Sequence, residues 1–109
     1  MSQRYSENAP ARSDIDATTG PLLLEFGSNT CGICRGTEPL ITAALADHAS
    51  LAHIKVQDGS GRPLGRSFRV KLWPTLIFLR DGNEVARLVR PDSVEEIRNA
   101  LTQAFGVGS

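Results

Sequence analysis

The stretch from Leu22 to Arg35 constrains the fold of this chain most, because it joins a buried strand to a helix that begins at two cysteines. The run Leu22–Phe26 is short, apolar and bounded by a proline and a glycine, which is typical of a central strand. Cys31 and Cys34 follow a short loop, and residues three apart share one face of a helical turn. A helix N-terminus offers unpaired N–H groups and partial positive charge, which favour a thiolate. The stretch therefore predicts a dithiol that can open and close as a redox site.

Length, composition and charge are those of one soluble domain. A chain of 109 residues, 40% hydrophobic and 22% charged, has room for a single core. Twelve basic and twelve acidic residues cancel, so net charge favours neither nucleic acid nor a membrane surface as a partner. The first 20 residues are polar and lack the apolar segment of a secretory signal, and no apolar run could span a bilayer. We expect a cytoplasmic monomer.

Three alternatives to a redox pair exist for the two cysteines. A structural disulfide is disfavoured in a reducing compartment. A zinc site needs four ligands, and the only histidines, His48 and His53, do not have the spacing of a zinc finger. Burial as small hydrophobic side chains is disfavoured by the polar loop Ser28–Thr30, which places the pair at a surface. We therefore favour a redox site with no metal and no bound cofactor.

The rest of the chain predicts an α/β sandwich around a mixed sheet. A polar composition predicts a flexible N-terminal tail over residues 1–20, and one domain follows over residues 21–109. Periodicity and turn residues predict the remaining elements. They are a helix from Cys31 to about Ala49 kinked at Pro39, a strand Leu51–Val56, a short helix Pro63–Phe68, a strand Thr75–Leu79, a turn at Asp81-Gly82, a strand Glu84–Val89, and a last helix capped by Ser93 and Glu96.

These features together resemble the thioredoxin family. A Cys-x-x-Cys motif beside a βαβ pattern is a known signature of that family, and further features stand at matching intervals between Pro21 and Phe105. They are Glu25 six residues before Cys31, where the family carries a buried acid, Pro39 in the active-site helix, the segment Phe68–Thr75 around the family's cis-proline, and the Asp81-Gly82 hairpin. The resemblance implies a thioredoxin fold of four or five strands, because the family's first strand has no counterpart before Pro21. It also implies a thiol–disulfide oxidoreductase that acts on protein or peptide disulfides.

The sequence departs from the family pattern around the expected site. The usual Trp-Cys-Gly-Pro-Cys motif reads Thr-Cys-Gly-Ile-Cys from Thr30, and Gly27 stands where the family carries a tryptophan. Trp73 precedes the expected cis-proline, where a smaller aliphatic residue is common, and Arg90 lies in what resembles a glycine-containing loop. These changes leave the substrate open. They also leave a second class open, a binding or scaffolding module whose dithiol is vestigial or regulatory.

The catalytic candidates are Cys31, Cys34 and Glu25. Cys31 is nearer the exposed loop and the positive end of the helix, so we expect it to attack a target disulfide and Cys34 to close the ring. The resemblance implies that Glu25 accepts the Cys34 proton, and burial would raise the pKa of such a carboxyl toward a useful range. An ordinary strand glutamate remains an equal alternative. His53 could face Glu25 from the next strand, but a one-residue slip reverses that facing, and we expect a surface residue.

The substrate-binding candidates are Trp73, Pro74, Thr75 and Arg90. By resemblance, Pro74 packs against the cysteine pair and the Trp73 backbone pairs with an extended substrate. The resemblance further implies an external reductant, such as a thioredoxin reductase or a glutathione system.

Overall fold

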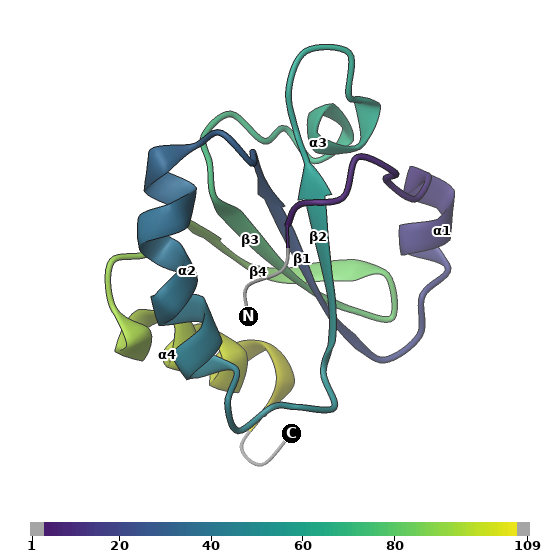
Figure 1. Cartoon of the computed structure of the whole chain (residues 1–109). Coiled ribbons are helices and arrows are strands. Elements are labelled where there is room, and N and C mark those ends of the chain that lie inside the picture. The colour runs from purple at the N-terminus through teal and green to yellow at the C-terminus, as the bar shows by residue number, and fades with distance from the viewer. Residues whose placement is uncertain (1–3, 107–109) are drawn as a thin grey trace.

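A computed structural model describes residues 4–106, which form one mixed sheet between two layers of helices (Figure 1). The strand order is β2-β1-β3-β4, with β1 parallel to β2, β3 antiparallel to β1, and β4 antiparallel to β3. The strands are β1 (Pro21–Gly27), β2 (Ala52–Gln57), β3 (Thr75–Arg80) and β4 (Asn83–Val89). The sheet confirms the expected sandwich in its four-stranded form.

The helices divide between the two faces of the sheet, as Figure 1 shows. One face is covered by α2 and α4, and the other by the shorter α1 and α3. Their bounds are α1 (Arg12–Asp16), α2 (Gly32–Ala44), α3 (Pro63–Ser67) and α4 (Val94–Phe105). Within residues 4–106 no helix is both long enough and apolar enough to cross a membrane.

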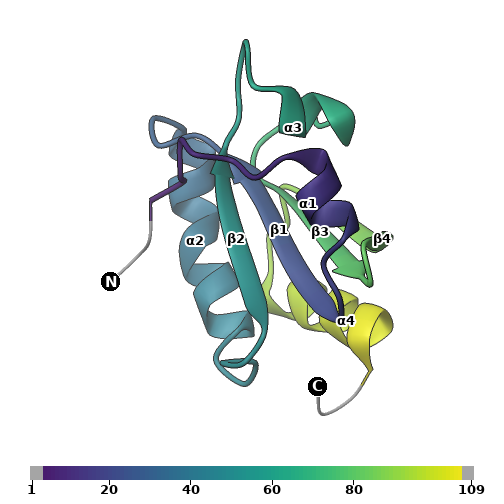
Figure 2. The ribbon, with the colours of Figure 1, turned by 90° about the vertical axis from the view of Figure 1, so that its right-hand side faces the viewer.

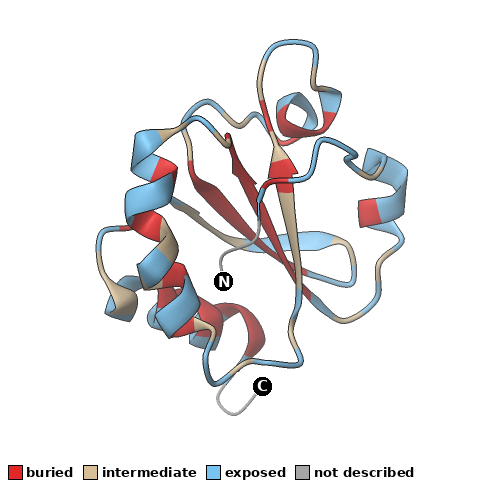
Figure 3. Ribbon diagram, viewed as in Figure 1, coloured by how far each residue is buried: buried red, intermediate tan, exposed pale blue. Residues whose placement is uncertain are grey.

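Strand β1 is the centre of the core because both of its faces are apolar. Leu22, Leu24 and Phe26 pack into the cluster under α1 and α3, whereas Leu23 packs into the cluster under α2 and α4. Figure 3 shows β1 and β3 as the most continuously buried strands. Each fully buried leucine stabilises the fold by roughly 1.5–3 kcal/mol relative to an exposed one. The alternation of side chains along β1 places Glu25 on the Leu23 face, which α2 and α4 cover.

Local signals set the turns and helix ends. Asp81 and Gly82 adopt φ values of 52° and 80°, the left-handed pair that a tight hairpin turn requires. Ser93 Oγ accepts a hydrogen bond from the Glu96 N–H at 3.1 Å and caps α4 as expected. The expected α2 was too long. It ends at Ala44, with Leu45 as the C-cap residue, and a turn follows.

The N-terminal segment, defined as residues 4–11, packs against the sheet, so the expectation of a flexible tail over residues 1–20 is wrong from residue 4 onward. Tyr5 is 8% exposed, and α1 buries Ile15. The Ser6 backbone bridges to β2 through Ser6 N–H to Lys55 O and Gln57 N–H to Ser6 O, each 2.9 Å. Figure 2 shows the segment crossing the end of β2 from the α2 side to α1. Residues 1–3 of the expected tail and 107–109 of the expected domain lie outside the described residues.

The physical reason for this difference is that two apolar side chains suffice to dock a polar segment. Ile15 packs into the core cluster under α1 and α3, and Tyr5 is buried separately. The backbone between them pairs with the otherwise open edge of the sheet at β2. The average composition of a segment does not reveal one or two isolated side chains that become buried.

Candidate active site

The two cysteines lie at the first turn of α2 but in different surroundings. Cys31 is the N-cap residue and is partly exposed, and its Sγ accepts a hydrogen bond from the Cys34 backbone N–H at 3.1 Å. An N-cap side chain that accepts from the third helical N–H satisfies one of the unpaired donors of the helix. Cys34 is 3% exposed, and both cysteines are free thiols. The pair is therefore reduced, with one accessible sulfur and one buried sulfur.

The Cys34 thiol is held in its protonated form. Burial raises the pKa of Cys34 from 9.0 to about 11, and its hydrogen bond with Cys31 adds to this. The Ser28 backbone N–H and the Tyr5 hydroxyl both act to lower the pKa of Cys34, but they do not reverse the effect of burial. A sulfur must be a thiolate to attack a disulfide, so Cys34 needs a proton acceptor before it can react.

A buried carboxylate lies beneath this pair. Glu25 is 1% exposed, its Oε1 lies 2.9 Å from His53 Nε2, and its Oε2 accepts a hydrogen bond from the Tyr5 hydroxyl. Glu25 is thus not an ordinary solvated strand residue, although its catalytic role remains a prediction. The expectation for His53 is wrong, because its side chain is 22% exposed and faces Glu25. The parallel register pairs His53 with Leu23, which puts both side chains on the Glu25 face.

Tyr5 is a site residue that sequence reasoning missed. Its ring fills the space beside Gly27 so closely that a Cβ on Gly27 would overlap it. Its hydroxyl donates to Glu25, and Tyr5 lines the same hollow as Cys34. Burial, followed by the charge of Glu25, raises the pKa of Tyr5 far above its ordinary value. The available signal was the glycine at position 27 in place of a family tryptophan, together with the lone aromatic residue of the first 12.

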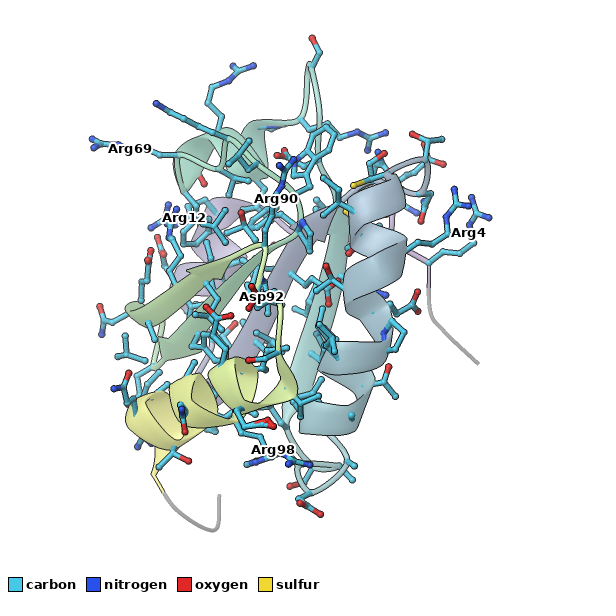
Figure 4. The ribbon with its side chains drawn as sticks, turned by 90° about the vertical axis from the view of Figure 1, so that its left-hand side faces the viewer. Arg4, Arg12, Arg69, Arg90, Asp92 and Arg98 are labelled. Carbon is cyan, nitrogen blue, oxygen red and sulfur yellow. The ribbon has the colours of Figure 1, made fainter. Side chains whose placement is uncertain are left out.

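The Trp73–Thr75 loop leaves the sheet at the same end as the cysteine loop. In the register of β1 and β3, Thr75 lies opposite Phe26, which closely precedes the cysteine loop. The Trp73-Pro74 peptide bond is cis, as the resemblance implies, and Pro74 is buried. Arg90 Nε donates to Trp73 O at 2.8 Å and Arg90 N donates to Pro74 O at 2.9 Å. Figure 4 shows Arg90 in the stretch that leads from β4 toward α4. The structure thus brings together all four substrate-binding candidates.

Trp73 is half-buried rather than fully exposed at the rim. Its indole Nε1 donates to Asp58 Oδ2 at 2.9 Å, and Asp58, which is 8% exposed, donates its own N–H to Gly27 O at 2.8 Å. Sequence reasoning missed Asp58, because nothing local marks it. It also missed the apolar surface beside the site, where Ile33 and Leu72 are 47% and 48% exposed.

Two hollows border the buried groups. One of about 160 Å³ is lined by Tyr5, Cys31 and Cys34 among others. A groove of about 450 Å³ between α2 and β2 is lined by Glu25 and His53 and opens to solvent. Within residues 4–106, no three His, Cys, Asp or Glu side chains gather to hold a metal ion. The accessible Cys31 sulfur, the buried Cys34 thiol and the buried Glu25 can together carry out thiol–disulfide exchange with transfer of a proton.

Comparison with known proteins gives matches over nearly the whole chain. The sequence model of the Thioredoxin family matches residues 5–103. A thioredoxin of Chlamydia pneumoniae is 33% identical over 92 residues, which cover 83% of this chain and 88% of that protein. A thioredoxin of Mycolicibacterium smegmatis is 31% identical over 96 residues, 85% and 86% of the two chains. The solved structure of thioredoxin 2 from Pseudomonas aeruginosa PAO1 in its reduced form has a TM-score of 0.84 and 52% identity, covering 94% of each chain.

Proposed function

The chain belongs to the thioredoxin family and is a thiol–disulfide oxidoreductase, and from this we propose that it reduces disulfides in proteins and peptides. The observation that carries the proposal is the asymmetry of its cysteines. Cys31 offers a partly exposed sulfur that already accepts an N–H donor, whereas Cys34 is buried behind it. An accessible nucleophile and a shielded resolving thiol suit a two-step exchange with a large substrate.

In the proposed reaction, the Cys31 thiolate attacks one sulfur of a target disulfide and forms a mixed disulfide, releasing the other target sulfur. Cys34 then loses its proton and attacks Cys31 Sγ, and the remaining target sulfur leaves with the electron pair. The target gains two thiols, and the protein is left with a Cys31–Cys34 disulfide. Glu25 is the proposed final acceptor of the Cys34 proton, because it is the buried carboxylate beneath the pair.

We assign substrate binding to the Trp73–Thr75 loop and its apolar border. No hydrogen bond within residues 4–106 uses the Trp73 backbone N–H, so this group is available to an extended peptide. Arg90 holds the loop from behind through the Trp73 carbonyl. The exposed side chains of Ile33 and Leu72 supply apolar surface for residues next to the target cysteine.

The oxidised protein needs an external reductant to turn over. We propose a thioredoxin reductase or a glutathione system for this step, and a cytoplasmic location, where such reductants keep thiols reduced.

Reduction of insulin by dithiothreitol, followed as turbidity, tests the proposed function. The wild type should accelerate precipitation of the insulin B chain, and Cys31→Ser should abolish the acceleration. A matched Cys34→Ser variant should accumulate the mixed disulfide, which intact mass spectrometry detects. Equal rates for wild type and Cys31→Ser would mean that the dithiol does not reduce protein disulfides.

A further inference from the structure

We propose that Tyr5 relays the proton of Cys34 to Glu25, and that His53 connects Glu25 to solvent. The inference rests on the proposed division of work between Cys31 and Cys34. It assigns a step in the reaction to the N-terminal segment, which composition alone marks as a tail.

Tyr5 is held firmly enough to act as a relay. Its backbone N–H donates to Asn29 Oδ1 at 2.8 Å, and Asn29 Nδ2 donates to Tyr5 O at 3.0 Å. The Lys55 ammonium lies 4.7 Å from the centroid of the Tyr5 ring, and the absent side chain of Gly27 leaves room for that ring. Contacts from β1, β2 and the cysteine loop thus position the hydroxyl.

The hydroxyl contacts the acid, and Tyr5 shares a hollow with the thiol. The hydroxyl donates to Glu25 Oε2, and Tyr5 and Cys34 line the same hollow of about 160 Å³. In this position the Tyr5 hydroxyl acts to lower the pKa of Cys34. Within residues 4–106 no hydrogen bond joins Glu25 to Cys34 directly. A proton that passes from Cys34 to Glu25 through protein groups therefore passes through Tyr5.

The relay step balances as a double proton transfer. The Cys34 S–H bond breaks and its proton goes to the Tyr5 oxygen, while the phenolic proton moves to Glu25. Tyr5 ends neutral, as it began, and Glu25 ends protonated. The electron pair left on Cys34 Sγ forms the bond to Cys31 Sγ, and the target sulfur leaves as a thiolate. A phenol suits this work because it can accept one proton as it donates another.

His53 gives the proton a route outward. Its Nε2 lies 2.9 Å from Glu25 Oε1, its side chain is 22% exposed, and both residues line the groove between α2 and β2. The other charged or titratable groups that line the two hollows along this path are Arg4, Arg35, Glu38, His48 and Lys55. Lys55 from β2 and Glu38 from α2 form an ion pair at 3.8 Å. That pair lies beside the path, and the relay itself uses neither member.

The test uses Tyr5→Phe, which keeps the ring beside Gly27 and removes only the hydroxyl. Reduced protein is mixed with 5,5′-dithiobis(2-nitrobenzoate) in a stopped-flow instrument, and absorbance at 412 nm follows release of thionitrobenzoate. The first release reports attack by Cys31, and the second reports resolution by Cys34. We expect Tyr5→Phe to slow the second release at pH 7 by about tenfold, and to change the first by less than threefold. A change of less than threefold in the second release, or equal slowing of both releases, would overturn the relay.

The pH dependence of the second release separates a relay from a structural role. In Tyr5→Phe the resolving thiolate forms only by exchange with solvent, so the rate should rise about tenfold per pH unit between pH 7 and 9. The wild type should rise less steeply. If the rate of the second release rose equally steeply with pH in the wild type and in Tyr5→Phe, the relay would be contradicted.

Two further variants complete the design. When Tyr5→Phe is added to Glu25→Gln, it should slow the second release by less than a further threefold, because the relay already lacks its proton acceptor. A further tenfold slowing in the double variant would also overturn the relay. Cys34→Ser should give one release and stop. Two releases from that variant would instead disprove the proposed roles of the cysteines, so failure of the relay and failure of the function are distinguishable.

Discussion

Cys31 and Cys34 belong to one helical turn, yet only one of the two sulfurs is accessible. Cys31 caps the helix and accepts the Cys34 N–H, whereas Cys34 lies beneath the turn and keeps its proton. At the scale of single residues, then, a capping interaction and burial separate two chemically identical side chains into two roles.

Alkylation should distinguish these roles. We expect brief treatment of the reduced protein with iodoacetamide at pH 7 to modify Cys31 and spare Cys34, because Cys34 is buried and its pKa is raised to about 11. Peptide mapping by mass spectrometry locates the label, and unfolded protein serves as the control in which both cysteines react. Preferential labelling of Cys34 would reverse the assignment.

Glu25 offers a second prediction at this scale. Glutamine at position 25 can accept from the Tyr5 hydroxyl and donate to His53, so Glu25→Gln preserves both hydrogen bonds and removes a desolvated charge. We expect a melting temperature raised by a few degrees, and resolution by Cys34 slowed by at least about tenfold. Differential scanning calorimetry and the two-step thionitrobenzoate assay measure the two effects. A variant unchanged in both would show that Glu25 plays no part in the reaction.

At the scale of elements, the site is assembled where three loops leave one end of the sheet. The strand register brings these loops together, because Thr75 of β3 lies opposite Phe26 of β1 on one side and opposite Val89 of β4 on the other. The cysteine loop, the cis-proline loop and Arg90 therefore follow from adjacent strand ends.

Arg90 should matter through its side chain and not through its backbone. Its φ of 51° is left-handed, so Arg90→Gly should be about 1 kcal/mol more stable than Arg90→Ala. Both variants lose the bond to Trp73 O, so both should raise the KM for insulin severalfold with little change in kcat. Urea denaturation and steady-state kinetics measure these effects. A KM raised only in Arg90→Ala would mean that backbone strain, and not the lost bond, affects binding.

The contact between the N-terminal segment and β1 predicts a coupling energy. Tyr5→Ala should cost about 3 kcal/mol of unfolding free energy, as expected for a buried aromatic side chain. Gly27→Ala should cost on the order of 2 kcal/mol when Tyr5 is present, because the new Cβ overlaps the ring, and much less when residue 5 is alanine. Urea unfolding of the four proteins in the cycle gives the coupling. Additive costs would mean that the ring and the glycine do not depend on each other.

At the scale of the whole molecule, the part of the chain from residue 4 to 106 buries two acidic protons whose loss opposes folding, those of Tyr5 and Cys34. Burial raises both pKa values above the ordinary 10.0 and 9.0, so the folded state binds these protons more tightly than the unfolded state. The resulting stability is complete below about pH 9 and is lost as pH rises further.

We therefore expect the urea midpoint of the reduced protein to fall steadily above pH 9. Tyr5→Phe and Cys34→Ser should each show a shallower fall, since each lacks one of the two titrating groups. A wild-type midpoint that stays constant up to pH 11 would contradict the burial of both groups.

How well the sequence predicted a feature depended on how far apart along the chain the interacting residues lie. Leu22–Phe26, the Asp81-Gly82 turn and the Ser93 cap were predictable because their signals lie within a few residues. Glu25 could be placed on a face by alternation, but its partners His53 and Tyr5 come from other segments. Strand parity alone cannot say which way His53 faces, because a one-residue shift reverses it. The docking of Tyr5 depends on a space that exists only after the sheet has formed.

The filling of that space also has an evolutionary consequence. A ring at position 5 and a side chain at position 27 compete for one volume, so a single codon change at either position creates a hole or an overlap. Lineages should therefore separate into those that inherit a large residue at 27 with a small one at 5, and those that inherit the reverse. Only descendants of the second kind keep a phenol against the buried acid, and a change in the N-terminal segment can alter proton chemistry while both cysteines stay the same.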